Sequence, residues 1–145
     1  MGIFYRVTCR NKDCRYSAEI REGPGMLLFA RLTTMEADIK SGKKDAPADI
    51  KALLAAGYEL ECVSTYLCPV FKEWQTQKYP YVLEKTQVSP YGTIREYKVH
   101  YLGDEPKCKT CGTNLEFILN PRSSKNCCPR CGTSDMKVGP KGYYD

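Results

Sequence analysis

The sequence predicts an α+β chain rich in β structure, organised as two small cysteine-bearing modules joined by a β-hairpin. Three observations support this fold class. Nine cysteines fall mostly in close pairs toward the two ends of the chain. Alternating apolar residues, which are typical of strands, run through the segments beside them, and helical spacing of apolar residues marks only 28–54. The expected units are a split module at 1–74, a linking hairpin at 75–104 and a second module at 105–145.

Composition restricts the class of protein. With 145 residues, 42% apolar content and 11 tyrosines, the chain can bury a core. It contains no apolar run near the roughly 18 residues of a membrane span, and its N-terminus lacks the pattern of a secretory signal. We therefore expect a cytoplasmic protein with no membrane partner.

The cysteine pairs are the strongest chemical signal. In a reducing compartment, close pairs are more typical of metal ligands than of disulfides, and a secreted chain usually holds an even number of cysteines. The pairs are Cys9 with Cys14, Cys62 with Cys68, Cys108 with Cys111, and Cys128 with Cys131, and Cys127 is left over.

The C-terminal cysteines have the spacing of a zinc site. CKTCGTNLEFILNPRSSKNCCPRCG is a C-x2-C pair, sixteen residues and a second C-x2-C pair, which suits tetrahedral coordination by four thiolates. Gly112 and Gly132 follow the pairs and can supply the positive φ that closes each turn. We expect the metal to clamp the base of a hairpin that includes NLEFIL. The predicted ligands of one zinc ion are Cys108, Cys111, Cys128 and Cys131.

Two adjacent cysteines compete for one place in this spacing. The segment Cys128-Pro129-Arg130-Cys131-Gly132 repeats the frame of residues 108–112, whereas Cys127 would need a three-residue spacer. We therefore interpret Cys128 as the ligand and Cys127 as a bystander.

With these motifs, residues 105–145 resemble a zinc ribbon, and their C-P-x-C-G turn is similar to the rubredoxin knuckle. The resemblance implies metal binding and a ribbon fold but no particular function, because ribbons serve in many kinds of protein. Iron accepts the same four sulfurs, so a rubredoxin-like electron carrier is an alternative. The full chain is also loosely similar to small bacterial proteins with a ribbon-like cysteine pair at each end.

The N-terminal half is interpreted as a second ribbon, split by a helical insertion. IFYRVTC and CRYSAEI predict strands that flank the turn 9–14. Apolar stripes predict one helix up to Gly42 and another up to Gly57, the second with Asp45 as a candidate cap. YELECVSTYLC predicts a strand that leads into Cys68-Pro69. This segment begins like a knuckle but carries Phe71 where a second cysteine would stand.

A second zinc ion at Cys9, Cys14 and Cys68 would be one ligand short. Cys62 is six residues from Cys68, about 20 Å along an extended strand, so the two cannot share a metal unless the strand breaks. His100, the only histidine, is a candidate fourth ligand, although a lone histidine in a strand is more often an ordinary strand residue. The alternative is a decayed site packed as apolar thiols.

Charge and aromatic residues give weak support for nucleic-acid binding. The net charge is +5, and residues 107–145 carry seven basic and three acidic side chains. Four thiolates around Zn²⁺ bring a local charge of −2, which offsets much of that excess. The tyrosines of the predicted hairpin, 79–88 with 93–102, suit half-buried sheet positions better than a base-stacking platform. The basic residues around the C-terminal knuckles are Lys107, Lys109, Arg122, Lys125 and Arg130.

These observations favour a non-enzymatic binding or adaptor module with a protein partner, and a weak nucleic-acid binder is the alternative. The sequence has no phosphate-binding loop, no G-x-S-x-G and no H-E-x-x-H. A thiol oxidoreductase would need an accessible C-x-x-C pair with a low pKa, and metal binding would occupy both C-terminal pairs.

Overall fold

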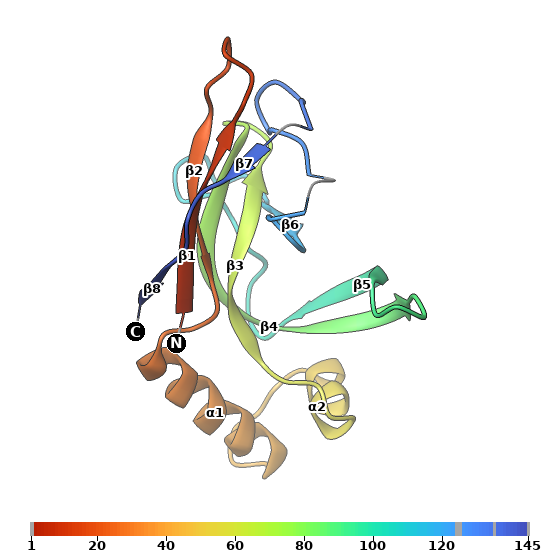
Figure 1. The fold of residues 1–145 in the computed structure, drawn as a ribbon. Helices are drawn as coiled ribbons and strands as arrows, with labels where there is room; N and C mark the ends of the chain where they lie inside the picture. The colour runs from red at the N-terminus through yellow and green to blue at the C-terminus, as the bar shows by residue number, and fades with distance from the viewer. Residues whose placement is uncertain (1, 124–125, 135, 145) are drawn as a thin grey trace.

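A computed structural model describes residues 2–123, 126–134 and 136–144 (Figure 1). The strands are β1 (Gly2–Cys9), β2 (Ser17–Glu22), β3 (Glu61–Cys68), β4 (Glu73–Val88), β5 (Ile94–Tyr101), β6 (Glu116–Ile118), β7 (Met136–Val138) and β8 (Gly142–Tyr144). The helices are α1 (Met26–Lys40) and α2 (Ala48–Ala55). The predicted α+β, β-rich class is confirmed.

The strands form two antiparallel sheets that each combine distant parts of the chain. In the first sheet the order is β2-β1-β7, and β8 also pairs with β1. In the second sheet the order is β5-β4-β3-β6. Figure 1 shows the first and last strands, β1 in red and β7 and β8 in blue, side by side, with the two ends of the chain close together. Each sheet therefore contains strands from both 1–74 and 105–145.

The C-terminal strands pair with N-terminal strands, which differs from the expected C-terminal hairpin. β6, which lies in NLEFIL, pairs with β3, and β7 pairs with β1. Strands of three residues bury too little to hold each other, whereas the longer β1 and β3 each offer an edge for pairing. The predicted C-terminal hairpin, with a zinc ion at its base, is therefore not formed in the described part of the structure.

The two predicted N-terminal and central hairpins are confirmed. β1 and β2 pair on either side of the turn 9–14. β4 and β5 pair across the turn at 89–92, where Gly92 has a φ of 84°. Within this second hairpin Tyr81 is buried, and its ring lies 5.5 Å from the ring of Phe117 on β6. Tyr81 is thus a sheet residue, as the half-buried interpretation expects.

Both helices lie where the apolar stripes place them. Ile39 of α1 and Ile50 and Leu54 of α2 share a core with Val82 of β4. The expected cap is wrong, because Pro47 occupies the N-cap position of α2 with no side-chain cap, and Asp45 instead pairs with Lys51 at 2.8 Å. No helix in the described part of the chain is both long and apolar enough to cross a membrane.

A second core lies between the two sheets. Tyr5, Val7 and Ile20 of the first sheet pack in one cluster with Trp74 of β4 and with Cys128. The two sheets therefore share a core that also contains Cys9 and has Cys14 packed against it.

Candidate metal centres

Seven of the nine cysteines lie in two clusters. Within each cluster all Sγ atoms are within 4.8 Å of one another. The four-sulfur cluster consists of Cys9, Cys14, Cys128 and Cys131. The three-sulfur cluster consists of Cys68, Cys108 and Cys111.

The distances between sulfur atoms match a shared metal ion. The Sγ atoms of Cys9 and Cys131 are 3.6 Å apart, and those of Cys14 and Cys128 are 3.7 Å apart. Tetrahedral zinc with Zn–S bonds of about 2.3 Å separates its sulfurs by about 3.8 Å, whereas a disulfide bond is about 2.05 Å long. The spacing in the four-sulfur cluster therefore fits one tetrahedral ion, and the thiols are not paired as disulfides.

The four-sulfur cluster forms at one end of β1. Cys9 is the last residue of β1, and Cys14 lies in the turn that leads to β2. The other two sulfurs come from the turn 128–131, which precedes β7, and β7 pairs with β1 so that Met136 is opposite Cys9. The pairing of β1 with β2 on one side and β7 on the other thus brings together two turns from opposite ends of the chain.

The glycines close the C-terminal turns as predicted. Gly132 has a φ of 78°, and its N–H donates to the carbonyl of Cys128 at 2.9 Å. Gly112 has a φ of 72° and donates in the same way to Cys108 at 2.8 Å. A side chain would be strained at this φ, so glycine suits both positions.

The three-sulfur cluster forms at the end of β3. Cys68 is the last residue of that strand, and the turn 108–111 precedes β6, which pairs with β3. The Sγ atoms of Cys68 and Cys111 are 3.7 Å apart. Gln75 of β4 donates from Nε2 to the Sγ of Cys108 at 3.3 Å. Gln75 was not singled out from the sequence, because only the pairing of β3 with β4 places it beside this sulfur.

The structure divides the predicted ligands in a different way. Cys108 and Cys111 were expected to share a metal with Cys128 and Cys131, but the two pairs lie in separate clusters. The expected N-terminal trio is divided too, since Cys68 is apart from Cys9 and Cys14. The physical reason is that each C-terminal turn is positioned by the strand that follows it, and β6 and β7 join different sheets.

Each cluster contains one thiol that ionises readily. A hydrogen bond from Gln75, helped by backbone N–H groups of residues 110 and 111, lowers the pKa of Cys108 to about 6. A backbone hydrogen bond from Thr133 lowers the pKa of Cys131 to about 7. Burial raises the pKa of Cys9 to about 12. Adjacent thiolates repel one another, and a divalent cation relieves that repulsion, so both clusters suit a thiophilic metal.

Two cysteines belong to neither cluster. Cys62 is buried in the core beneath the helices, together with Leu60 and Val82. Cys127 is exposed at the surface beside Cys128. The four-sulfur cluster therefore takes its sulfurs from one strand end and two turns. The three-sulfur cluster takes its sulfurs from one strand end and one turn.

His100 lies apart from both clusters and joins α2 to the β4–β5 hairpin. Its Nδ1 is 2.7 Å from Asp49 Oδ2, and its Nε2 is 2.9 Å from Glu84 Oε1. Burial lowers the pKa of His100, but hydrogen bonds to the two carboxylates more than offset this, so the net pKa is raised above its usual 6.5. The side chain therefore links α2 to the hairpin through two carboxylates and is not a ligand of either cluster.

The His100 link predicts a pH-dependent stability. A raised pKa in the folded state stabilises the protein fully below the pKa of the unfolded chain, and this contribution is lost as pH rises through the folded-state pKa. Denaturant unfolding of the wild type should therefore show a falling free energy of unfolding above about pH 6.5. His100→Gln should lower stability by about 1–3 kcal/mol at pH 6, because it removes a charged, hydrogen-bonded link. An equal pH dependence in the wild type and His100→Gln would contradict this assignment.

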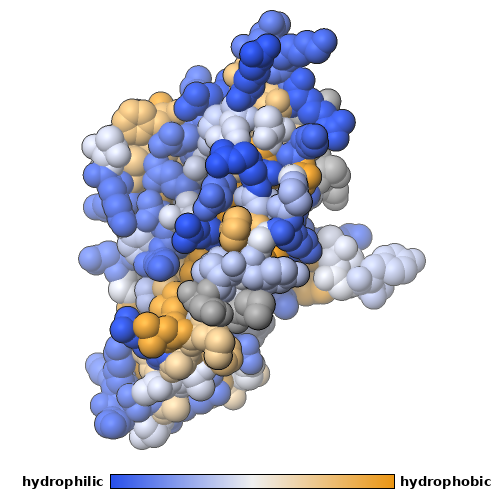
Figure 2. All heavy atoms as spheres, turned by 60° about the vertical axis from the view of Figure 1, so that its left-hand side comes forward, coloured by the Kyte–Doolittle hydropathy of each residue, from blue (hydrophilic) through white to orange (hydrophobic). Residues whose placement is uncertain are grey.

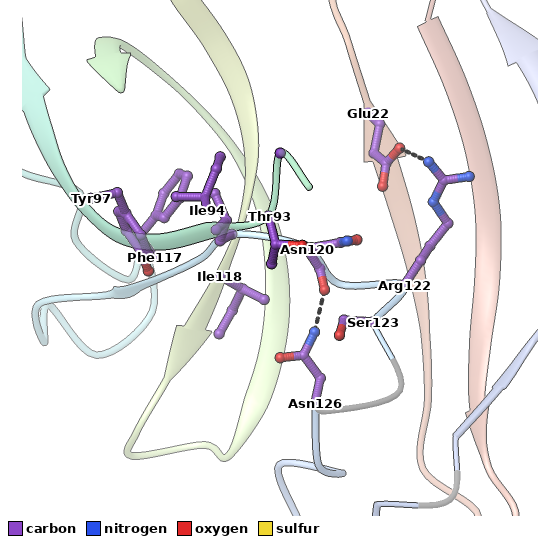
Figure 3. Close-up of a pocket in the computed structure, with 12 residues that line it drawn as sticks. Glu22, Thr93, Ile94, Tyr97, Phe117, Ile118, Asn120, Arg122, Ser123 and Asn126 are labelled. Atoms are coloured by element: carbon purple, nitrogen blue, oxygen red, sulfur yellow. Dashed lines mark hydrogen bonds and ion pairs between the residues drawn. The ribbon is translucent and has the colours of Figure 1, made fainter. Parts of the chain in front are cut away.

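A pocket of about 910 Å³ lies between β5, β6 and the segment around Asn120 (Figure 3). Its charged residues, Arg122 and Glu22, pair with each other at 3.1 Å. Asn126 donates from its side chain to the carbonyl of Asn120. Its two named charges neutralise each other, so this pocket is a weaker candidate site than the sulfur clusters.

The basic residues expected to contact phosphate are partly engaged within the protein. Arg122 pairs with Glu22, and its guanidinium lies 5.4 Å from the centre of the Tyr5 ring. Arg130 lies over the ring of Tyr16 at 4.8 Å and is 4.0 Å from Glu73. Lys125 lies outside the described residues. Lys107 and Lys109 are exposed, so two of the five basic residues remain open to solvent while the two arginines contact other side chains.

The fold and the clusters define a β-rich chain with two cysteine groups able to hold metal. Comparison with models of protein families, with curated proteins and with solved structures finds no match. The argument for function therefore rests on the geometry of the two clusters.

Proposed function

We propose that the protein is a non-catalytic zinc-binding module of the adaptor type, in which zinc at the four-sulfur cluster ties the C-terminal segment to the N-terminal strands. The observation that carries the proposal is the convergence of four Sγ atoms within 4.8 Å, although the pairs in contact are 122 and 114 positions apart in the sequence. A complete set of four cysteine ligands is typical of structural zinc and leaves no open position for a substrate.

A metal ion at this cluster would supply stability that the C-terminal strands lack. β7 and β8 have three residues each, and strands this short contribute few ladder hydrogen bonds and little burial. Binding of structural zinc contributes about 10–16 kcal/mol in small zinc-dependent modules. Zinc at this position would therefore hold β7 against β1 and would keep both ends of the chain in one sheet.

A protein partner is supported by apolar side chains on the surface of α1. Met26, Leu27 and Phe29 at the start of that helix are each at least 60% exposed. Figure 2 shows hydrophobic side chains gathered in the lower part of the molecule, at the height of the helices, whereas the upper part is mostly hydrophilic. Because Arg122 and Arg130 are engaged within the protein, we favour a protein partner over nucleic acid.

Metal content is the direct test of the zinc proposal, and two adjacent cysteines provide a matched pair of variants. Protein purified without chelators should contain zinc, and Cys128→Ser should lower the content by about one ion per chain because one of four ligands is lost. Cys127→Ser should leave the content unchanged. Elemental analysis distinguishes zinc from iron, and an iron form would also be red. A wild-type content below about half an ion per chain would contradict the proposal.

The same variants test the binding role. When used as bait, wild type and Cys127→Ser should retain the same partner, whereas Cys128→Ser should lose it because the folded surface depends on the metal. Titration of single-stranded RNA, single-stranded DNA and duplex DNA tests the alternative. Sub-micromolar nucleic-acid binding that weakens steeply as salt is added would favour that alternative over a protein partner.

A further inference from the structure

The two sheets repeat one arrangement of strands and cysteine turns. In the first sheet, β1 ends at Cys9, turns into its partner β2, and pairs on its other side with β7, which follows the turn 128–131. In the second sheet, β3 ends at Cys68, turns into its partner β4, and pairs on its other side with β6, which follows the turn 108–111. Each sulfur cluster thus combines the end of a central strand with the turn before its third strand.

The turn after Cys68 has the geometry of a metal knuckle. The N–H of Lys72 donates to the carbonyl of Cys68 at 2.8 Å, as Gly112 does to Cys108 at 2.8 Å. Lys72 also has a φ of 52°, which is rare for a residue with a side chain. The N–H of Phe71 points to the Sγ of Cys68 at 3.5 Å. Phe71 therefore stands where the C-P-x-C pattern places a second cysteine.

We propose that the three-sulfur cluster binds a second metal ion through three thiolates and leaves the fourth coordination position, beside Phe71, to a small thiol from outside the chain. Within the described residues, the cluster contains no fourth cysteine, histidine or carboxylate near enough to complete it. Three protein ligands with one open position are typical of metal sites that exchange a ligand. The inference shares its metal chemistry with the proposed function but concerns a different cluster.

The donor set is supported by its surroundings. Gln75 donates from Nε2 to Cys108 Sγ, and its Oε1 accepts from Gln77 at 3.1 Å, which fixes the orientation of the amide. A second hydrogen bond from Gln75 Nε2 to Glu73 holds the same orientation. Such contacts orient metal ligands.

The two turns that form the three-sulfur cluster reach the surface beside the open position. Phe71 is 43% exposed, and Cys111 is half-buried. Three thiolates around a divalent ion would carry a net charge of −1, which opposes a fourth anionic ligand, and the exposed lysines at 72 and 109 in the two turns offset part of this charge. A thiol that binds there gives up its proton to solvent and coordinates as a thiolate, which is the ligand that a thiophilic ion prefers.

Cobalt(II) provides the test, because it takes tetrahedral sulfur sites and its visible spectrum reports the ligands. The wild type should bind two cobalt ions per chain, and Cys68→Ser should bind one. Addition of 2-mercaptoethanol should shift the visible bands of the wild type. Phe71→Cys should bind its second cobalt at least tenfold more tightly and should show no shift, because its own sulfur completes the site. Phe71→Leu is the matched control and should respond like the wild type.

The outcomes separate this inference from the proposed function. One cobalt per chain, lost in Cys128→Ser and unaffected by Cys68→Ser, would overturn the second site and leave the four-sulfur site intact. Two ions with no response of the wild type to 2-mercaptoethanol would overturn the external thiol as the fourth ligand. Binding of no cobalt at all would overturn the proposed function itself.

Discussion

Replacing Cys14 and Cys131 together should remove the same single metal ion as replacing either alone, because both sulfurs belong to one cluster. Replacing Cys111 and Cys131 together should instead remove two ions, one from each cluster. Variants that act on one shared site are not additive, whereas variants at separate sites are. The metal content of serine variants, measured by elemental analysis, therefore reports which cysteines share a metal ion.

Loss of the ion at the four-sulfur cluster should also have the largest effect on the free energy of unfolding. Structural zinc contributes about 10–16 kcal/mol in zinc-dependent modules, which exceeds the free energy of unfolding of most domains of this size. We expect Cys14→Ser to release β7 and β8 from β1, seen as loss of amide protection in hydrogen exchange at those strands. If replacing Cys111 and Cys131 together removed only one ion, the two cysteines would share a metal, as the predicted C-terminal zinc ribbon requires.

Local features of the cysteine turns could be read from the sequence. Gly112 and Gly132 close their turns because a positive φ is needed immediately after each pair, and this need is visible in the motif itself. The partner of each turn could not be read in this way. A separation of sixteen residues between Cys111 and Cys128 is compatible with one shared ion or with two, because the choice depends on which sheet the following strand joins.

Among the strands, too, those with partners nearby in the sequence could be predicted, and those with distant partners could not. β1, β2, β4 and β5 are long enough for alternation to mark them, and each hairpin is closed by a short turn. β6, β7 and β8 have three residues each, so their periodicity carries little signal and their partners lie far away in the chain. That Phe71 stands at the second-cysteine position of a knuckle was visible in the sequence, but the pairing of β3 with β6, which brings Cys108 and Cys111 beside Cys68, was not.

Replacing Trp74 by alanine should destabilise the protein by about 3–5 kcal/mol, the usual cost of removing a large buried aromatic side chain. Trp74 belongs to β4 of the second sheet but packs with Tyr5, Val7 and Ile20 of the first, and it is only 7% exposed. Its backbone N–H also donates to the hydroxyl of Tyr16 at 2.7 Å. The side chain therefore fills the core that the two sheets share.

Denaturant unfolding followed by circular dichroism measures this effect, because the variant lacks the single tryptophan that fluorescence would report. Tyr91→Ala is the matched control: Tyr91 is 95% exposed at the tip of the β4–β5 hairpin, and its loss should change stability by less than about 0.5 kcal/mol. The zinc content of folded Trp74→Ala should equal that of the wild type, since the substitution leaves all seven clustered sulfurs in place. A loss of stability below about 1 kcal/mol would mean that the two sheets do not depend on this shared core.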